Sequence, residues 1–484
     1  MPDEIQASSL IHERRSANYK PNIWKYGFLE SLNSKYHGDD YTRQSEKLIE
    51  DVKNHMFFVG TKDLITQLKL IDSIGKLGLT NHFEKEIKEA LDTIASTENN
   101  DPHMTENLYA IALHFKILRQ HGYKVSQDVF DGFLDEKGML EKSHFSDVKG
   151  MLELLEASNL ALDGENVLDE AKAFSTLALR DSNICNILDN NLARHVVHAL
   201  ELSSHRRVGW FNVKWHIHAY EKDNHVKTIL LELAKLNFNM VQATLQKDIK
   251  EASKWDVGET GQLPDCMKIC FQVLYNTTCE IAHEIEEENG WNLVLPHLSK
   301  VWADFCKALL LEAEWYSSGY TPSLEEYLSN GCISSSASVL LVHTFFSTTR
   351  RDQPTEEIAD FWHKNEDFVN NISLIVRLTN DLATYRAEQE RGDAPSAILC
   401  YMPEMNVSEN IAEMKIKGII DKAWKKINGK CLRTPQVPFL SPFINIAINI
   451  ARMVHNLYQD GDGFADQEKG SRLIQSLLAE PLLL

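Results

Sequence analysis

The sequence predicts an all-α protein with more than one domain. A chain of 484 residues is too long for a single small core. It contains only 22 glycines and 13 prolines, and the prolines lie mainly between periodic segments. This distribution favours long helices over many short strands. Apolar residues also recur at helical spacing along most of the chain.

The clearest helical segment lies just before the middle of the chain. Its apolar residues follow one another at intervals of 4, 3, 4 and 4 and form one stripe over four turns: Ala234, Phe238, Val241, Leu245 and Ile249. Similar patterns cover 105–120, 150–160, 192–202, 298–314, 337–347, 411–425 and 443–457. The polar stretch 220–225 is the predicted boundary between an N-terminal domain, residues 1–225, and a C-terminal domain, residues 226–484.

Charge and composition exclude several classes of partner. The net charge of −20 argues against nucleic acid or an anionic membrane as the main partner. No apolar run approaches the length of a membrane span, and we expect a monomer or weak dimer. The first residues, MPDEIQASSLIHE, resemble neither a signal nor a transit peptide. As written, the chain is therefore expected to be cytoplasmic; a plastid location would follow if the N-terminus were incomplete.

The sharpest chemical signal is the segment RLTNDLATYRAEQERGD. Four of its polar residues are spaced 3, 4 and 4 apart and share one helix face, with an aspartate beside them: Arg377, Asn380, Asp381, Thr384 and Glu388. An amide, a hydroxyl and a carboxylate one turn apart form an all-oxygen ligand set suited to Mg²⁺. Arg377 could hold the phosphate that such an ion accompanies. Spacing alone also fits a solvated surface helix.

Two other polar clusters favour structural roles. His195 and His198 can share a helix face with His205 nearby, but no carboxylate or cysteine accompanies them, so we expect structural histidines. Glu280, Glu284 and Glu287 can also share a face, and the simplest interpretation is solvent exposure.

Several segments resemble the plant terpene synthase family over nearly the whole chain. RRSANYKPNIW resembles the paired-arginine and tryptophan motif of its monoterpene synthases. LLELAKLNFNMVQATLQKDIKEASKW, EAEWYSSGYTPSLEEYL and SPFINIAINIARMVHNLYQDGDGF are similar to further family segments. NDLATYRAE resembles the family's second metal motif, N/D-D-x-x-S/T-x-x-x-E.

The resemblance implies a fold and an activity. The expected fold is a relic, non-catalytic N-terminal α-barrel followed by a class I terpenoid synthase bundle. The expected activity is that of a carbon–oxygen lyase in terpenoid biosynthesis, which uses Mg²⁺, or Mn²⁺, to ionise a geranyl or farnesyl diphosphate before cyclisation or elimination. Asn380, Asp381, Thr384 and Glu388 would serve as the metal-binding residues.

The resemblance also suggests roles for four residues outside this helix. Arg14 and Arg15, together with Arg377, would bind the diphosphate. Alternatively, Arg14 and Arg15 would only fix the N-terminal strand to the rest of the protein. Tyr458 and Asp462 match the end of the family's active-site lid, where they could steer a cation or accept a proton. By sequence alone, YQDGDG is a glycine-rich turn.

Three departures from the family pattern stand out. The first metal motif, D-D-x-x-D, and the R-x-R before it are absent, and KEASKW runs directly into DVGETGQLPD. We therefore expect an internal deletion between Trp255 and Asp256 and an incomplete bundle. Ser396 stands where the family usually carries a diphosphate-contacting lysine. The kinked family helix reads ISSSAS at 333–338, without Gly-Pro, so we expect it to run straighter.

Three functional interpretations remain from the sequence. The chain is a terpene synthase impaired by the loss of D-D-x-x-D, a catalytically dead product of splicing or of the gene model, or a non-enzymatic all-α binding or scaffold protein. An intact first metal motif in the genomic sequence between the codons for Trp255 and Asp256 would identify an artefact.

Overall fold

We describe the fold from a computed structural model of the chain. It describes residues 26–54, 63–96, 106–136, 139–181, 189–223, 227–252, 265–289, 294–348, 365–392, 396–433, 441–459, 461 and 467–484. Within these ranges the structure is helical, and the extended pairing is a single antiparallel bridge between Leu134 and Leu140. The all-α prediction is therefore confirmed. No helix in the described ranges is long and apolar enough to cross a membrane.

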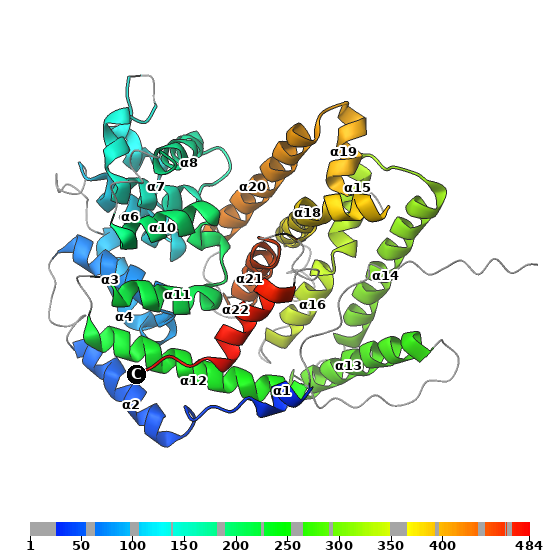
Figure 1. Ribbon diagram of the computed structural model, residues 1–484, viewed down its shortest axis with the longest axis horizontal. Helices are drawn as coiled ribbons and strands as arrows, with labels where there is room; N and C mark the ends of the chain where they lie inside the picture. The colour runs from blue at the N-terminus through cyan, green and yellow to red at the C-terminus, as the bar shows by residue number, and fades with distance from the viewer. Residues whose placement is uncertain are drawn as a thin grey trace, which may run out of the picture.

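The N-terminal half is a set of short helices (Figure 1). Its α-helices are α1 (Tyr26–Ser31), α2 (Asp39–Val52), α3 (Leu64–Lys76), α4 (Glu84–Ser96), α6 (Leu108–Gln120), α7 (Val148–Ser158), α8 (Asn166–Leu179), α10 (Asn190–Glu201) and α11 (Gly209–Glu221). Short 3₁₀ turns separate them at η2 (Thr80–His82), η3 (Gln127–Phe133), η4 (Lys142–Ser146) and η5 (Ser204–Arg206). Their apolar faces fill two neighbouring core clusters.

The C-terminal half contains a further set of helices, of which the first and the last pack in the core of the N-terminal helices and the others surround a separate core cluster. They are α12 (Thr228–Ala252), α13 (Asp265–Asn289), α14 (Val294–Ser318), α15 (Leu324–Ser334), α16 (Ala337–Thr348), α18 (Glu366–Arg391), α19 (Ala397–Met405), α20 (Glu409–Arg433), α21 (Ser441–Tyr458) and α22 (Gln467–Ala479). The central helix is α18, which packs on α15, α16, α19, α20 and α21. In Figure 1, α13 and α14 lie at the outer edge of this half.

Helix α12 packs differently from its predicted stripe. Ala234 and Phe238 are fully buried in the core of the N-terminal helices, but Val241, Leu245 and Ile249 are only half-buried. The buried face towards the C-terminal end of α12 is polar instead. Its residues Asn239, Gln242 and Gln246 donate to the carbonyls of Leu482, Leu477 and Leu478 at the end of the chain. The C-terminal tail therefore satisfies amides that would otherwise be buried unpaired.

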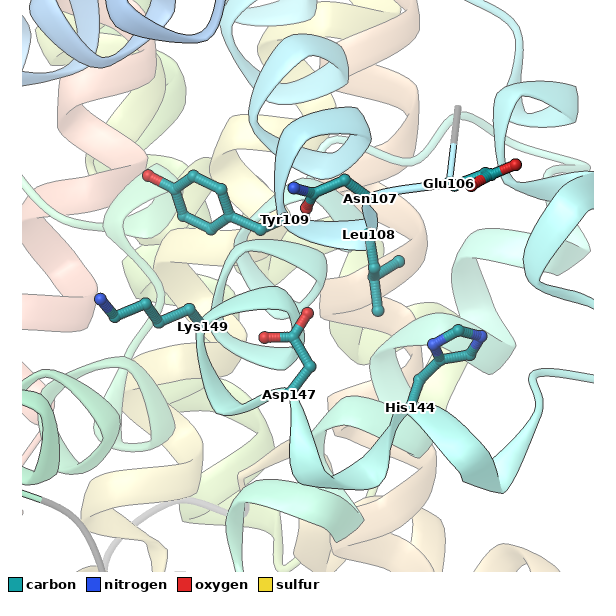
Figure 2. Close-up of a pocket in the computed structure, with 7 residues that line it drawn as sticks. All are labelled: Glu106, Asn107, Leu108, Tyr109, His144, Asp147 and Lys149. Carbon is teal, nitrogen blue, oxygen red and sulfur yellow. The ribbon is translucent and has the colours of Figure 1, made fainter. Parts of the chain in front are cut away.

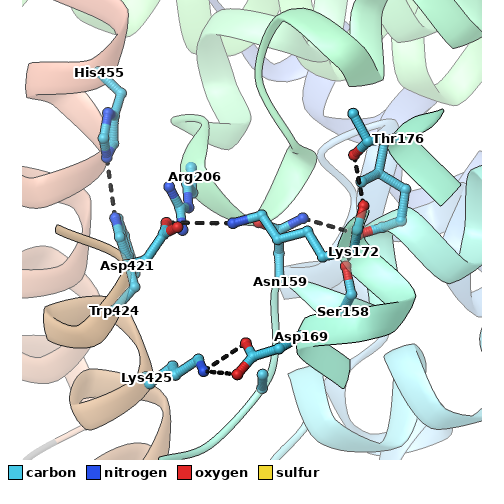
Figure 3. A network of polar contacts seen from close by, with 12 residues as sticks. Ser158, Asn159, Asp169, Lys172, Thr176, Arg206, Asp421, Trp424, Lys425 and His455 are labelled. Carbon is cyan, nitrogen blue, oxygen red and sulfur yellow. Dashed lines mark hydrogen bonds and ion pairs between the residues drawn. The ribbon is translucent and has the colours of Figure 1, made fainter. Parts of the chain in front are cut away.

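Polar contacts join the two halves along α20 (Figure 3). Asp421 of α20 forms ion pairs with Arg206 of η5 and with Lys172 of α8, the latter at 3.2 Å. Lys425 pairs with Asp169 of α8 at 2.5 Å. Further along α20, Nδ2 of Asn428 donates to two backbone carbonyls, those of residues 159 and 161, at 3.1 and 3.0 Å. These contacts hold the N-terminal helices against α20, the helix on which α18 packs.

Candidate functional site

The residues of the predicted metal motif all lie on one helix, α18. Thr384 is only 4% exposed, and its hydroxyl donates to the backbone carbonyl of Asn380 at 3.1 Å. The side chains of Asn380 and Glu388 are partly exposed. The hydroxyl oxygen of Thr384 keeps its lone pairs because its proton is used in this bond. An amide oxygen, a hydroxyl oxygen and a carboxylate thus follow one another along the helix.

This donor set fits a hard divalent cation. All the available ligand atoms are oxygens, as Mg²⁺ and Mn²⁺ prefer. The described residues hold no group of three His, Cys, Asp or Glu side chains placed to bind a metal. An ion at this helix would therefore depend on the neutral oxygens of Asn380 and Thr384 as well as on Glu388.

Asp381 has a different environment from the other motif residues. Its side chain is 2% exposed, and Oδ2 accepts from the hydroxyl of Tyr327 at 2.8 Å and from the backbone N–H of Ala397 at 2.9 Å. Burial raises the pKa of this carboxyl group, against the opposing effects of Arg377 and the two hydrogen bonds. Asp381 thus ties α18 to α15 and α19. We therefore remove it from the ligand set suggested by the sequence and assign it to the support of the site.

Arg377 lies one turn before Asn380 and is held by the end of α15. Its Nη2 donates to Oγ of Ser334 at 3.0 Å, and its Nε approaches the carbonyl of Gly331 at 3.5 Å. A Cβ atom at Gly331 would lie 3.2 Å from Cγ of Arg377, so the glycine allows this close approach.

Two carboxylates flank the same guanidinium. Nη1 lies 3.5 Å from Oδ1 of Asp381, and Nη2 lies 3.7 Å from Oε1 of Glu312 on α14. Burial alone would lower the pKa of Arg377, but the carboxylates of Asp381, Glu312 and Glu388 outweigh it and raise the pKa above its ordinary value. The sequence analysis did not identify Glu312, Tyr327 or Ser334, because their role depends on how three helices pack together.

The remaining predicted site residues are only partly covered by the structure. Tyr458 is the last residue of α21 and is half-buried. Arg14, Arg15 and Asp462 lie outside the described residues, as do Trp255 and Asp256 at the expected deletion. Their proposed roles remain predictions.

The segment ISSSAS breaks the helix, so the expectation of a straighter helix is wrong. Helix α15 ends at Ser334 and α16 begins at Ala337. Between them Ser336 adopts a left-handed conformation with φ of 62°. A short polar residue tolerates this conformation better than a β-branched one does, so the kink forms without Gly-Pro.

Ser396 is the N-cap residue of α19 and directly precedes Ala397, whose backbone N–H donates to Asp381. The residue is 2% exposed, and its hydroxyl has no hydrogen-bond partner within the described structure. A short hydroxyl cannot replace the reach or the charge of the lysine that the resemblance suggested for this position.

The other clusters considered from the sequence serve packing or face solvent. His198 stacks on Trp215 with ring centroids 3.9 Å apart, and His195 meets the edge of the same ring. Nε2 of His205 lies 2.8 Å from Oδ1 of Asn428. These contacts support structural histidines. The side chains of Glu280, Glu284 and Glu287 are exposed, as predicted.

A surface pocket lies in the N-terminal half, between the start of α6 and the start of α7 (Figure 2). Among its lining residues, Asn107 and Asp147 accept backbone N–H groups of their own helices, from Ala110 and Gly150. Both side chains are therefore helix caps. The pocket contains none of the motif residues of α18.

Comparisons with known proteins agree along the whole chain. The family model "Terpene synthase, N-terminal domain" matches residues 23–200, and "Terpene synthase family, metal binding domain" matches residues 244–426. The chain is 58% identical to "(E,E)-alpha-farnesene synthase" of Malus domestica, covering 100% of this chain and 96% of the relative. It is 46% identical to "Alpha-farnesene synthase" of Ricinus communis, covering 99% and 97%. The Malus alignment runs over 559 positions, whereas this chain has 484 residues.

Solved structures of plant terpene synthases also resemble this chain. A crystal structure of limonene synthase with 2-fluorolinalyl diphosphate superposes with a TM-score of 0.89 at 31% identity, covering 97% of this chain and 100% of the other. Isoprene synthase from grey poplar, in complex with three Mg²⁺ ions and dimethylallyl-S-thiolodiphosphate, gives 0.81 at 33% identity, covering 96% and 99%. With helices throughout the described ranges, an all-oxygen motif on α18 and these relatives, the chain belongs to the plant terpene synthase family.

Proposed function

We propose that this chain binds a prenyl diphosphate together with Mg²⁺ or Mn²⁺ at the motif face of α18, and that its turnover is strongly impaired. The observation that carries the proposal is the placement of Asn380, Thr384 and Glu388 on one helix beside Arg377. The names of the two farnesene synthases support a farnesyl chain over a geranyl chain.

The chemistry expected at this site begins with cleavage of the carbon–oxygen bond of the substrate. The diphosphate leaves with the electron pair, and the allylic cation that remains loses a proton or cyclises. When bound, the metal ion would supply positive charge that stabilises the departing diphosphate.

The chain's own residues would prepare this step. Asn380, Thr384 and Glu388 would hold the ion, and Arg377 would orient the diphosphate from one turn away. Tyr458 and Asp462 remain the candidates for steering the cation or accepting its proton.

We expect impaired turnover because the chain lacks the second set of metal ligands that would face α18. One helix cannot surround a diphosphate, and no D-D-x-x-D occurs anywhere in the 484 residues. The alignment with the Malus relative, which is longer than this chain, supports an internal deletion. Removal of a single preorganised contact typically costs about 2.7–4 kcal/mol of transition-state stabilisation, so the loss of a whole carboxylate motif should reduce turnover by several orders of magnitude.

The surface of the C-terminal half is consistent with a missing wall. Leu310 on α14 and Tyr275 on α13 are each 60% exposed. On α14 the neighbours of Leu310 in the sequence, Leu309 and Leu311, are also 42% and 37% exposed, and a large exposed apolar patch is uncommon in a complete fold. Half-burial of the last three residues of the α12 stripe supports the same interpretation.

A turnover assay tests the proposal. Purified chain is incubated with Mg²⁺ and geranyl, neryl or farnesyl diphosphate, and volatile products are measured by gas chromatography and mass spectrometry beside the Malus relative. We expect product far below that of the relative. Insertion of the relative's segment between Trp255 and Asp256 should restore turnover with farnesyl diphosphate.

A matched pair of variants then tests the site itself. In the restored chain, Glu388→Ala should abolish turnover, whereas Glu390→Ala, which alters an exposed carboxylate two residues further along α18, should not. Restored turnover that survives Glu388→Ala would refute the assignment of this helix. Turnover on the order of 1 s⁻¹ by the unmodified chain would refute the impairment.

A further inference from the structure

Glu312 is an acidic side chain placed beside the cation of the candidate site. It lies on α14, with its side chain 20% exposed. Its Oε1 accepts from the hydroxyl of Ser334 at 2.5 Å and lies 3.7 Å from Nη2 of Arg377. The amide of Asn330 also approaches the same oxygen, at 3.5 Å. The carboxylate therefore lies at the junction of α14, α15 and α18.

The two carboxylates around Arg377 differ in what they do for the fold. Asp381 is nearly inaccessible and accepts two further hydrogen bonds, from Tyr327 and from the start of α19. Glu312 is more exposed, and its partners other than Arg377 are a hydroxyl and an amide. These two neutral donors would bind an amide oxygen as well as a carboxylate. The negative charge of Glu312 is therefore not required for its hydrogen bonds.

Glu312 also affects how strongly Arg377 can attract a diphosphate. One guanidinium faces two carboxylates within 4 Å, so its positive charge is already compensated before any ligand arrives. A diphosphate that approaches Arg377 also approaches Glu312, and like charges at this range repel strongly in a partly buried site.

We infer that Glu312 is a counter-charge that competes with the diphosphate for Arg377 and so limits the affinity of the site. The inference rests on the proposed function, because it takes Arg377 as a diphosphate contact. In this account Glu312 keeps the guanidinium oriented towards α15 while the site is empty, and it must yield Nη2 when a diphosphate binds.

The test uses inorganic pyrophosphate with excess Mg²⁺ and isothermal titration calorimetry on the full chain. Glu312→Gln removes the charge and keeps the acceptor oxygen, so pyrophosphate should bind about tenfold more tightly than to the unmodified chain. Glu312→Asp keeps the charge and should leave binding weak. Glu314→Gln, an exposed position on the same helix, is the matched control and should change affinity less than about twofold.

The dependence of binding on salt and on Arg377 distinguishes a failure of the counter-charge from a failure of the diphosphate site. The gain from Glu312→Gln should shrink as ionic strength rises and should be smaller when Arg377→Gln is added, because only the direct repulsion between Glu312 and the diphosphate then remains. Binding that depends on Arg377 but is equal in Glu312→Gln and the unmodified chain would overturn the counter-charge. Binding that does not depend on Arg377, or no binding to any variant, would overturn the proposed diphosphate site and the inference with it.

Circular dichroism melting of each variant checks that the fold is intact. If Glu312→Gln unfolds, its charge is needed for the fold and the inference fails.

Discussion

Acidification should weaken the packing of α20 against η5 and against α21, because an imidazole in each of these contacts, His205 and His455 respectively, is held neutral. Nε1 of Trp424 on α20 donates to Nε2 of His455 at 3.0 Å, so that nitrogen must stay unprotonated (Figure 3). Burial, together with Arg206 nearby, lowers the pKa of His455 to about 3. Burial and Arg452 lower the pKa of His205 to about 3 as well.

The sign and size of the effect follow from these values. Each pKa is lower in the folded than in the unfolded chain, where it is near 6.5, so protons bind preferentially to the unfolded state. The stability is complete above pH 6.5 and declines as the pH falls towards 3. At pH 5, about 1.5 units below the unfolded value, each imidazole should reduce the free energy of unfolding by about 2 kcal/mol. Two of them would remove about 4 kcal/mol, a large share of a typical stability.

Urea denaturation at pH 7.5 and pH 5 measures this loss. His455→Gln keeps an acceptor for Trp424 but does not titrate, so it should lose about 2 kcal/mol less than the unmodified chain between the two pH values. His218→Gln, at an exposed imidazole on α11, is the control and should follow the unmodified chain. Identical pH dependence in His455→Gln and the unmodified chain would refute the reasoning.

Two further predictions concern the support of the site. Tyr327→Phe removes a hydrogen bond from the buried carboxylate of Asp381 and should lower the free energy of unfolding by about 1–3 kcal/mol. Tyr320→Phe, at an exposed tyrosine, should change it by less than about 0.5 kcal/mol in the same urea titration; equal effects would contradict the buried tie. Gly331→Ala places a Cβ 3.2 Å from Cγ of Arg377. The close contact should destabilise the fold, but alanine favours the helix over glycine by about 1 kcal/mol, so the two effects should nearly cancel and leave the melting midpoint unchanged. The displaced Arg377 should nevertheless weaken pyrophosphate binding measured by calorimetry. Unchanged affinity would show that Arg377 does not need its observed position.

Much of the helical architecture could be predicted from apolar periodicity. The patterns at 105–120 and 337–347 correspond to α6 and α16, and the motif from Arg377 to Glu388 lies on a single helix. Periodicity reports which face of a helix is apolar but not what covers it. For this reason the stripe on α12 was only partly informative: its second half is covered less than a core face, while neighbouring glutamines are buried against the tail.

The residues that support the site could not be predicted from the sequence, because their contacts depend on how the helices pack. The pairing of Glu312 with Arg377 joins residues 65 positions apart through helix packing, and no spacing rule reports it. Asp381 looked like a ligand because it is an acidic residue within a metal motif, and only its burial and its two donors reveal a support role. The break at Ser336 was missed because the residue has a side chain where glycine is the usual indicator.

We propose above that α18 carries an ion site formed by Asn380, Thr384 and Glu388. The most direct measurement is electron paramagnetic resonance of Mn²⁺ added to the purified chain with pyrophosphate. We expect Mn²⁺ binding to be lost in Glu388→Ala and weakened in Thr384→Val, whereas Glu390→Ala should bind Mn²⁺ as the unmodified chain does. Equal Mn²⁺ binding by Glu388→Ala and the unmodified chain would contradict the claim.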